Sequence, residues 1–179
     1  MSSEATKGRD ERNEDAGFLE RIFAEQRAPL TRYAARLLGD ADRARDVVQD
    51  TFARLATQPH EAVDGHAVEW LFTVCRHRAF DVLRKENRMK RLADGEVERV
   101  TAEDPRPGRR LEEAETQATV LQLIAKLPPN QREVVRLKFQ NGFSYKEISR
   151  ITELSVGNVG FLIHTAVAKM RAEFAAQGL

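Results

Sequence analysis

"FSYKEISRITELSVGNVGFLIHTAVAKM", residues 143–170, is the stretch that decides the fold of the second half of this chain. Ser144 with Glu147 three positions later has the pattern of a capping box, which favours the start of a short helix. Ser155 can cap a second helix, in which apolar residues recur at helical spacing. Two helices separated by a tight turn are typical of a DNA-reading helix-turn-helix.

Two further helices are predicted immediately before this motif. Helical spacing of apolar residues runs through Leu111, Ala114, Ala118, Leu121, Ile124 and Leu127. It stops at Pro128-Pro129, where the second proline suits the first turn of the next helix, from residue 130 to about 140. Asn141-Gly142 then favours a turn into the motif.

Three helices are predicted in the first half of the chain. The first covers residues 18–38, where Pro29 suggests a kink or a break partway along. The second follows directly and can be capped by Asp40 or Asp42. The third begins near Ala67 and carries one apolar stripe.

The second half of the third helix is strongly basic. Between residues 76 and 91, seven Lys or Arg residues outnumber two acidic ones, Asp81 and Glu86. The seven are Arg76, Arg78, Arg84, Lys85, Arg88, Lys90 and Arg91. Cations clustered on one element are the pattern that follows a nucleic-acid backbone.

The predicted fold is all-α, with two small helical domains joined by a flexible linker. Residues 1–15 are charged and polar without an aromatic, and we expect a disordered tail there. Residues 92–110 contain two prolines and show no periodicity, which indicates a linker. The first domain then covers residues 16–91 and the second covers residues 111–179. No segment alternates with a period of two, so no strand is expected.

The composition restricts the classes of function. Lys+Arg 29 against Asp+Glu 28 gives a formal net charge of +1, so nucleic-acid binding must come from the distribution of charge. The single cysteine, Cys75, excludes a disulfide framework. Since no apolar run suits a membrane span or a signal peptide, we expect a cytoplasmic protein with no membrane contact.

Chemistry-bearing motifs are missing from the sequence. It contains no phosphate-binding loop, nucleophile elbow or paired-carboxylate motif, so we expect no enzyme activity, no catalytic residue and no cofactor. His60, His66, Cys75 and His77 are the only candidates for a metal site. Positions two apart on one helix point in different directions, so we expect no metal.

Two stretches together resemble one known family. The first is "ADRARDVVQDTFARL" (41–55), followed by "EWLFTVCRHRAFDVLRKENR" (69–88), and the second is "LPPNQREVVRLKFQNGFSYKEISRITELSVGNV" (127–159). Their order and spacing resemble the alternative sigma factors of bacterial RNA polymerase in their two-domain, extracytoplasmic-function (ECF) form. The combination is specific, because a helix-turn-helix alone would fit many regulators.

In that family the first domain docks on the clamp of core RNA polymerase and opens the minus-ten element of the promoter. The resemblance implies polymerase contacts at Arg45, Asp46, Gln49 and Phe52. It implies a base-capturing loop at residues 59–67 and matches Trp70, Leu71, Asp81 and Arg84 to the melting helix. We therefore expect minus-ten DNA contacts in this region, at His60, His66, Trp70, Arg76, His77, Arg78, Arg84, Lys85 and Arg88. Opening DNA requires unstacked bases to be trapped beside a basic surface. For Trp70 and Phe72 we favour a place in the core over base stacking.

The second domain in that family reads the minus-thirty-five element in duplex DNA. The resemblance implies contacts at Lys146, Ser155, Asn158, Phe161, His164, Thr165 and Lys169. Three positions that are basic in the family are Gly160, Leu162 and Thr165 here, and no Asp, Glu, Lys or Arg occurs between residues 154 and 168. The usual turn glycine is replaced by Glu153.

The uncharged helix leaves two interpretations open. It can read bases through Asn158, Thr165 and Phe161, with phosphate contacts from cations around it, and we then expect this domain to bind DNA weakly. Those cations are Lys146, Arg150, Lys169 and Arg171. Alternatively, Phe161 and Leu162 contact protein, either the first domain or a partner such as the β flap of the polymerase.

Arg45 is a second departure, because the family favours an acidic residue at this position. A cation there should lower the intrinsic affinity for the polymerase. Phosphorylation of Thr51 or Thr57 by a Ser/Thr kinase would restore negative charge, unless Thr51 simply faces the core or solvent. An anti-sigma factor is the other regulatory partner that we expect. The alternative functions are a dimeric helix-turn-helix regulator that acts without polymerase and a protein-binding adaptor.

Overall fold

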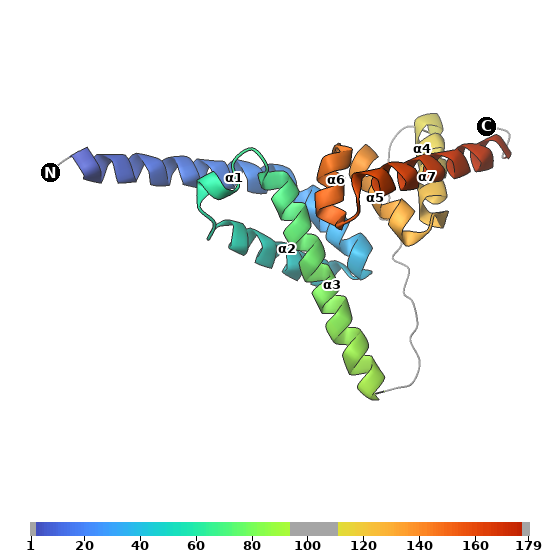
Figure 1. Ribbon diagram of the computed structural model, residues 1–179, viewed down its shortest axis with the longest axis horizontal. Coiled ribbons are helices and arrows are strands. Elements are labelled where there is room, and N and C mark those ends of the chain that lie inside the picture. Colours follow the sequence, from blue (N-terminus) through green and yellow to red (C-terminus); the bar gives the residue numbers. More distant parts are fainter. Residues whose placement is uncertain (1–2, 94–110, 177–179) are drawn as a thin grey trace. The chain divides into compact units, whose positions relative to one another are not determined.

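The structure, a computed structural model, describes the backbone of residues 3–93 and 111–176, with the side chains of 16–59, 61–89 and 119–176. In chain order its elements are α1 (Ser3–Leu38), α2 (Ala41–Leu55), the short 3-10 helix η1 (His60–Ala62), α3 (Ala67–Ala93), α4 (Leu111–Lys126), α5 (Pro129–Phe139), α6 (Tyr145–Thr152) and α7 (Val156–Ala176) (Figure 1). The described ranges contain no strand, which confirms the all-α prediction. Contacts divide the chain into two compact units, Met1–Asp104 and Pro105–Leu179. Most of the predicted linker, residues 94–110, lies outside the described residues.

In the first unit α1, α2 and α3 pack around one apolar core. Leu30, Leu55, Leu71 and Phe72 are fully buried at its centre, and the ring of Tyr33 lies 5.1 Å from that of Phe72, centroid to centroid. On α2 the buried residues are Ala44, Val47, Val48, Thr51 and Leu55, which recur every three or four positions. Burial of this one stripe leaves the opposite face of α2 in solvent.

The start of α2 settles which residue caps it. Asp40 has an extended backbone, and its carboxylate accepts hydrogen bonds from the amides of Asp42 and Arg43, both at 2.9 Å. The bond from Arg43 is the main cause that lowers the pKa of Asp40 below its ordinary value of 3.8. Asp40 is therefore the cap of α2.

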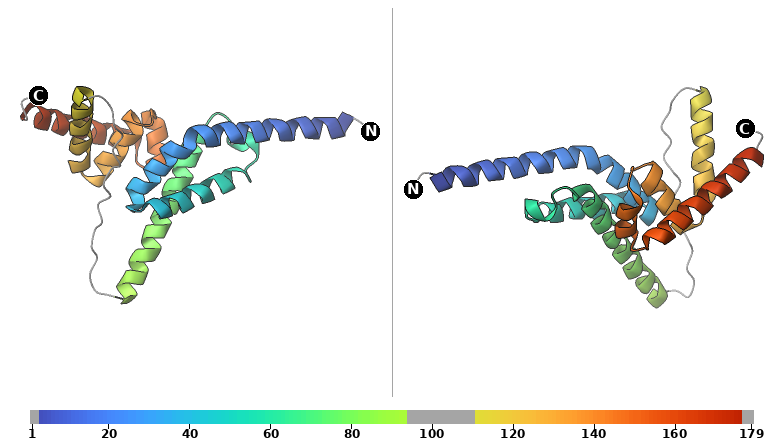
Figure 2. Two further views of the ribbon diagram at one scale, coloured as in Figure 1. Left: turned by 180° about the vertical axis from the view of Figure 1, so that it is seen from behind. Right: turned by 45° about the horizontal axis from the view of Figure 1, so that its top comes forward.

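The first helix differs from the prediction at its start. It begins at Ser3, so the disordered tail predicted over residues 1–15 is wrong for residues 3–15. Ala, Glu, Lys and Arg favour helix, and adding residues to an existing helix costs little, whereas the prediction considered only the lack of burial. Pro29 lies inside the helix without breaking it, and the ribbon bends in its second half (Figure 2).

The second unit places its four helices around a smaller core. Ile124 of α4, Leu127 directly after that helix, Val135 of α5 and Ala166 of α7 form one buried cluster, with partly buried Val120 and Met170 packed against it. The axes of α6 and α7 differ in direction by 105°. In the described residues no single helix is long and apolar enough to cross a membrane, although the bent α6–α7 pair meets the length and composition criteria jointly. This pair is the predicted helix-turn-helix.

Candidate polymerase and nucleic-acid interface

The solvent face of α2 carries the predicted polymerase contacts Arg45, Asp46 and Gln49. All three are exposed, because they lie on the side of the helix opposite its buried stripe. A guanidinium nitrogen of Arg45 lies 2.9 Å from a carboxylate oxygen of Asp42, and both side chains are largely in solvent, at 66% and 87% exposure. The charge of Arg45 is thus partly offset from within the same helix.

The fourth predicted polymerase contact, Phe52, packs against an aromatic residue of α1. The rings of Phe52 and Phe23 meet edge to face, with centroids 4.9 Å apart, and Phe23 is 44% exposed. The guanidinium carbon of Arg27 lies 5.6 Å from the centroid of the Phe23 ring. The exposed face therefore continues from α2 onto α1, which sequence reasoning missed because these residues are distant along the chain.

Thr51 is fully buried between α2 and α3. Its hydroxyl donates to the backbone carbonyl of Val47 at 2.7 Å, and its side chain also hydrogen bonds with Cys75. Phosphorylation of Thr51 in the folded chain is therefore a wrong prediction, because a kinase cannot reach the hydroxyl. Thr57 is exposed after the end of α2, with its hydroxyl donating to the carbonyl of Arg54 at 2.8 Å. Burial raises the pKa of the Cys75 thiol to about 12, with a smaller opposing effect from the bond with Thr51.

The loop before α3 is held at both ends and exposed between them. Val63 and Ala67 are buried, whereas His66 is exposed, with its Nδ1 3.0 Å from the carbonyl oxygen of Asp64. The side chain of His60 lies outside the described residues. On α3 Phe72 is fully buried, which confirms a core role for it, while Trp70 is half-buried and His77 is exposed.

Arg78, a predicted DNA contact, forms an ion pair within the first unit. Its Nε lies 2.6 Å from an Asp50 carboxylate oxygen on α2, and Nε of Arg54 lies 3.3 Å from the same oxygen. Arg76 takes a different position, with its guanidinium 4.7 Å from the ring centroid of Phe80. Sequence reasoning missed Asp50, since nothing local connects it with a residue 28 positions away.

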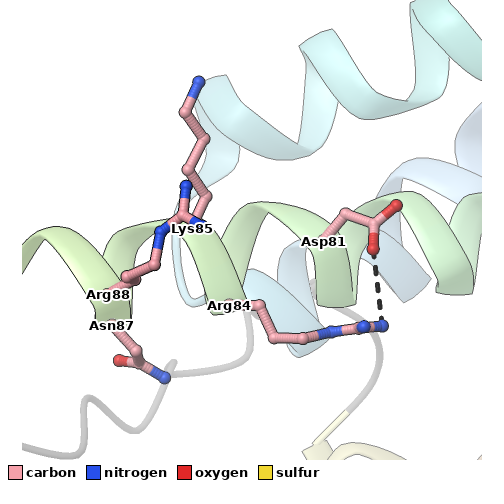
Figure 3. A pocket seen from close by; sticks show the side chains of 5 residues that line it. All are labelled: Asp81, Arg84, Lys85, Asn87 and Arg88. Atoms are coloured by element: carbon pink, nitrogen blue, oxygen red, sulfur yellow. Dashed lines mark ion pairs between the residues drawn. The ribbon is translucent and has the colours of Figure 1, made fainter.

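The basic half of α3 extends beyond α1 and α2 (Figures 1 and 2). Arg84, Lys85 and Arg88, all predicted minus-ten contacts, line a shallow pocket on it together with Asp81 and Asn87 (Figure 3). Arg84 pairs with Asp81 at 3.4 Å, and both side chains stay largely in solvent. Lys85 and Arg88 are exposed as well. This surface has the cations that a nucleic-acid backbone requires.

The helix-turn-helix has the predicted capping box. The amide of Ser144 donates to the Glu147 carboxylate at 2.7 Å, and the amide of Glu147 donates to the Ser144 hydroxyl at 3.3 Å. Hydrogen bonds from the Ser144 side chain and from the Ser144 backbone amide to the Glu147 carboxylate lower the pKa of Glu147. The turn passes through Glu153, whose φ of 61° is left-handed. Ser155 caps α7, since its hydroxyl accepts the amide of Asn158 at 3.2 Å.

The exposed face of α7 carries the predicted minus-thirty-five contacts. Val159, Ile163 and Ala166 are buried. The exposed residues of this helix include Asn158, Phe161, His164 and Lys169, and Thr165 is half-buried. At 65% exposure, Phe161 is the most exposed of the large apolar side chains that the structure describes. Lys146 on α6 is exposed as well. No acidic residue lies in the first turn of α7, so the positive end of its dipole is not offset there.

The ring of Tyr145 on α6 lies beside Gly160 of α7. A Cβ atom added at Gly160 would lie 3.6 Å from the Tyr145 ring. The ammonium of Lys138 lies 5.5 Å from the centroid of the same ring. Sequence reasoning missed Tyr145, because its position against α7 depends on the angle between the two helices.

Among the described side chains, no group of three or more His, Cys, Asp or Glu residues is placed to hold a metal ion.

Comparison with protein families gives two matches. The family described as Sigma-70 region 2 matches residues 22–89, and the family described as Sigma-70, region 4 matches residues 117–170. The ECF RNA polymerase sigma factor SigL of Mycobacterium tuberculosis is 30% identical over 159 residues, covering 88% of this chain and 89% of that protein. The ECF RNA polymerase sigma factor EcfG of Rhodopseudomonas palustris is 33% identical over 144 residues, covering 80% of this chain and 77% of that protein.

Solved structures have the same fold. The sigma factor RpoE from Bartonella quintana, in complex with the anti-sigma factor NepR, matches with a TM-score of 0.64 and 23% identity, covering 87% of this chain and 95% of that one. CnrH, in complex with the cytosolic domain of CnrY, matches with a TM-score of 0.53 and 23% identity, covering 88% of each chain.

Proposed function

Since the chain belongs to the ECF sigma factors of the sigma-70 family, and is thus an alternative sigma factor that directs promoter recognition, we propose which surfaces do this. The solvent face of α2, with Arg45, Asp46 and Gln49, binds the clamp of core RNA polymerase. Phe52 supports this face through its contact with Phe23. The observation that carries the proposal is the division of α2 into one buried stripe and one exposed polar face that the fold itself does not use.

Promoter opening is assigned to the loop before α3 and to the basic half of that helix. His66 and His77 are exposed on this part of the first unit, and Arg84, Lys85 and Arg88 form one cationic surface. Such a surface attracts the backbone of a separated strand, while the exposed loop is free to contact bases. We assign Arg78 a different role below, because its guanidinium is held by Asp50.

The exposed face of α7 reads the minus-thirty-five element with little electrostatic help. Asn158 offers a hydrogen-bond donor and an acceptor to a base edge, and Phe161 offers an apolar contact to a thymine methyl. The alternative occupant of this face is a protein, such as the polymerase β flap or an anti-sigma factor, and the exposure of Phe161 supports it. Measurement of the salt dependence of DNA binding, described in the Discussion, separates the two.

Arg45 restrains the binding of core polymerase. Relatives of this family favour an acid at this position, and the pair with Asp42 offsets only part of the added charge. Because both side chains are solvated, the effect is modest, up to about 1 kcal/mol or roughly fivefold in affinity. Phosphorylation by a Ser/Thr kinase is a further proposal that now rests on Thr57 alone, and intact-mass measurement of the protein from its host tests it.

The test is a titration of core RNA polymerase with the labelled chain, followed by run-off transcription. Arg45→Glu should bind roughly fivefold more tightly than the wild type, and Arg45→Gln should lie between them, because charge and not size is the cause. Gln49→Ala should weaken binding without unfolding the chain, since its side chain is exposed. Absence of binding by both wild type and Arg45→Glu would sink the assignment of α2.

A further inference from the structure

We infer that Asp50 and Arg78 are positioning residues that hold α3 at a set angle to α2, so that polymerase docking on α2 is coupled to promoter opening by α3. This inference rests on the proposed function of the two helices. It concerns residues that touch neither polymerase nor DNA in the proposed assignment. Their effect is transmitted through the orientation of the helices.

The geometry of the ion pairs supports this role. Arg78 on α3 and Asp50 on α2 meet at 2.6 Å, and Arg43 on α2 and Glu86 on α3 also meet at 2.6 Å. From Asp50 to Arg43 the chain moves backward by about two helical turns, while from Arg78 to Glu86 it moves forward by about two turns. The two pairs therefore join antiparallel helices at two separated points. One point alone would allow rotation, whereas two points restrict both sliding and crossing angle.

The apolar contacts between the helices stabilise the unit, whereas the ion pairs set the orientation of the helices. Val47 and Thr51 of α2 and Cys75 and Ala79 of α3 are buried in the unit and stabilise it by removing surface from water. That effect has no preferred direction, so it tolerates small changes of angle. Short hydrogen bonds between charged groups are directional. The ion pairs thus contribute orientation more than stability, which is consistent with their partial exposure.

The proposed contact surfaces lie on either side of this connection. The polymerase face of α2 carries Arg45 and Gln49, which are exposed, and the DNA surface of α3 carries Lys85 and Arg88. Asp50 lies one position after Gln49 on the same helix. Loss of the Asp50–Arg78 pair would leave the Arg43–Glu86 pair as a single pivot, so α3 could turn about that point and its basic end would project in a different direction.

The experiment compares Asp50→Asn, Arg78→Gln and the double variant in the full chain. Arg54→Gln is the matched control, because Arg54 binds the same Asp50 oxygen at 3.3 Å but lies on α2 itself and connects no second helix. Three quantities are measured: the affinity for core polymerase, the melting temperature of the free chain, and the fraction of open complexes. Open complexes are detected by the permanganate reactivity of unpaired thymines. The promoter used is one identified by run-off transcription of host DNA fragments with the wild-type holoenzyme.

Both single variants should lower the fraction of open complexes by about threefold, within the range of up to fivefold expected for a partly exposed ion pair. The double variant should be no worse than either single variant, because both remove the same connection. Polymerase affinity and melting temperature should stay close to wild type, and Arg54→Gln should open the promoter normally. A template with a pre-formed bubble should remove most of the defect.

Two results would overturn the inference. If Arg78→Gln is defective while Asp50→Asn equals or exceeds the wild type, Arg78 is a direct phosphate contact that Asp50 only competes for. If the variants lose polymerase affinity and melting temperature together with promoter opening, the pair is merely part of the folded core. Failure of the wild type to bind polymerase at all is a distinct result, which rejects the proposed function and with it any coupling.

Discussion

The double substitution Leu162→Arg and Thr165→Arg in α7 should make DNA binding by this protein markedly more dependent on salt. Both side chains are half-buried at the border of the exposed face that carries Phe161 and His164. A long side chain at such a border can cover apolar neighbours with its methylene groups and place its guanidinium in solvent. If that face lies in the major groove, the two guanidinium groups reach phosphates on its walls.

The expected change follows from the number of new phosphate contacts. Each contact adds about 0.9 to the slope of log affinity against log salt for duplex DNA. Two contacts add about 1.8, and a rise from about 50 to about 200 mM salt is about 0.6 log units. The variant should therefore lose roughly 12-fold more affinity than the wild type over this range.

Fluorescence anisotropy of a labelled duplex measures this slope with the full chain. A duplex of arbitrary sequence is sufficient, because phosphate contacts carry no sequence information. The matched control for size is Leu162→Gln with Thr165→Gln. The control for net charge is Gln122→Arg with Ala125→Arg, because both of these positions are exposed on α4. A slope equal to that of the charge control would refute the reasoning and favour a protein as the occupant of this face.

Three further predictions concern stability and reactivity. Glu153→Gly should raise the free energy of unfolding, measured in urea, by about 0.5–1 kcal/mol. The reason is that glycine relieves the strain of a left-handed φ, and this gain exceeds the cost of the greater entropy of glycine in the unfolded chain. A loss of stability would mean that contacts of the Glu153 side chain outweigh its backbone strain. Cys75, with its pKa raised to about 12, should resist iodoacetamide in the folded chain up to roughly pH 10, and rapid modification at neutral pH without denaturant would contradict its burial. Because the pKa of Asp40 is lowered by folding, its stabilisation of α2 is present above the ordinary pKa of 3.8 and is lost as the pH falls through the lower value in the folded chain. The difference in melting temperature between wild type and Asp40→Ala should therefore shrink below about pH 4, and a constant difference would argue against the capping carboxylate.

The helix-turn-helix was predictable because its determinants are local. The capping box joins Ser144 and Glu147, three positions apart, and the cap of α7 joins Ser155 and Asn158. Interactions of this range are present in the sequence pattern itself.

Contacts between residues that are distant in the sequence could not be predicted. Thr51 was a candidate for phosphorylation from its position near Arg45, but packing of α3 against α2 buries its hydroxyl completely. Arg78 was placed with the DNA contacts because of its charge, and the structure shows it bound to Asp50. Residues 3–15 are a separate and local case, since they were expected to be disordered because they are poor in apolar groups, although extension of a helix does not require burial.

The sequence by itself determined the all-α fold, the caps of α6 and α7 and the family of this sigma factor, because helix formation depends on residues within about four positions of each other. Only the tertiary structure decided which polar groups remain available on the surface. Pairs such as Arg78 with Asp50 and Arg43 with Glu86 form only when two helices pack at a particular angle and register. That angle comes from the fit of many buried side chains, which no local pattern specifies.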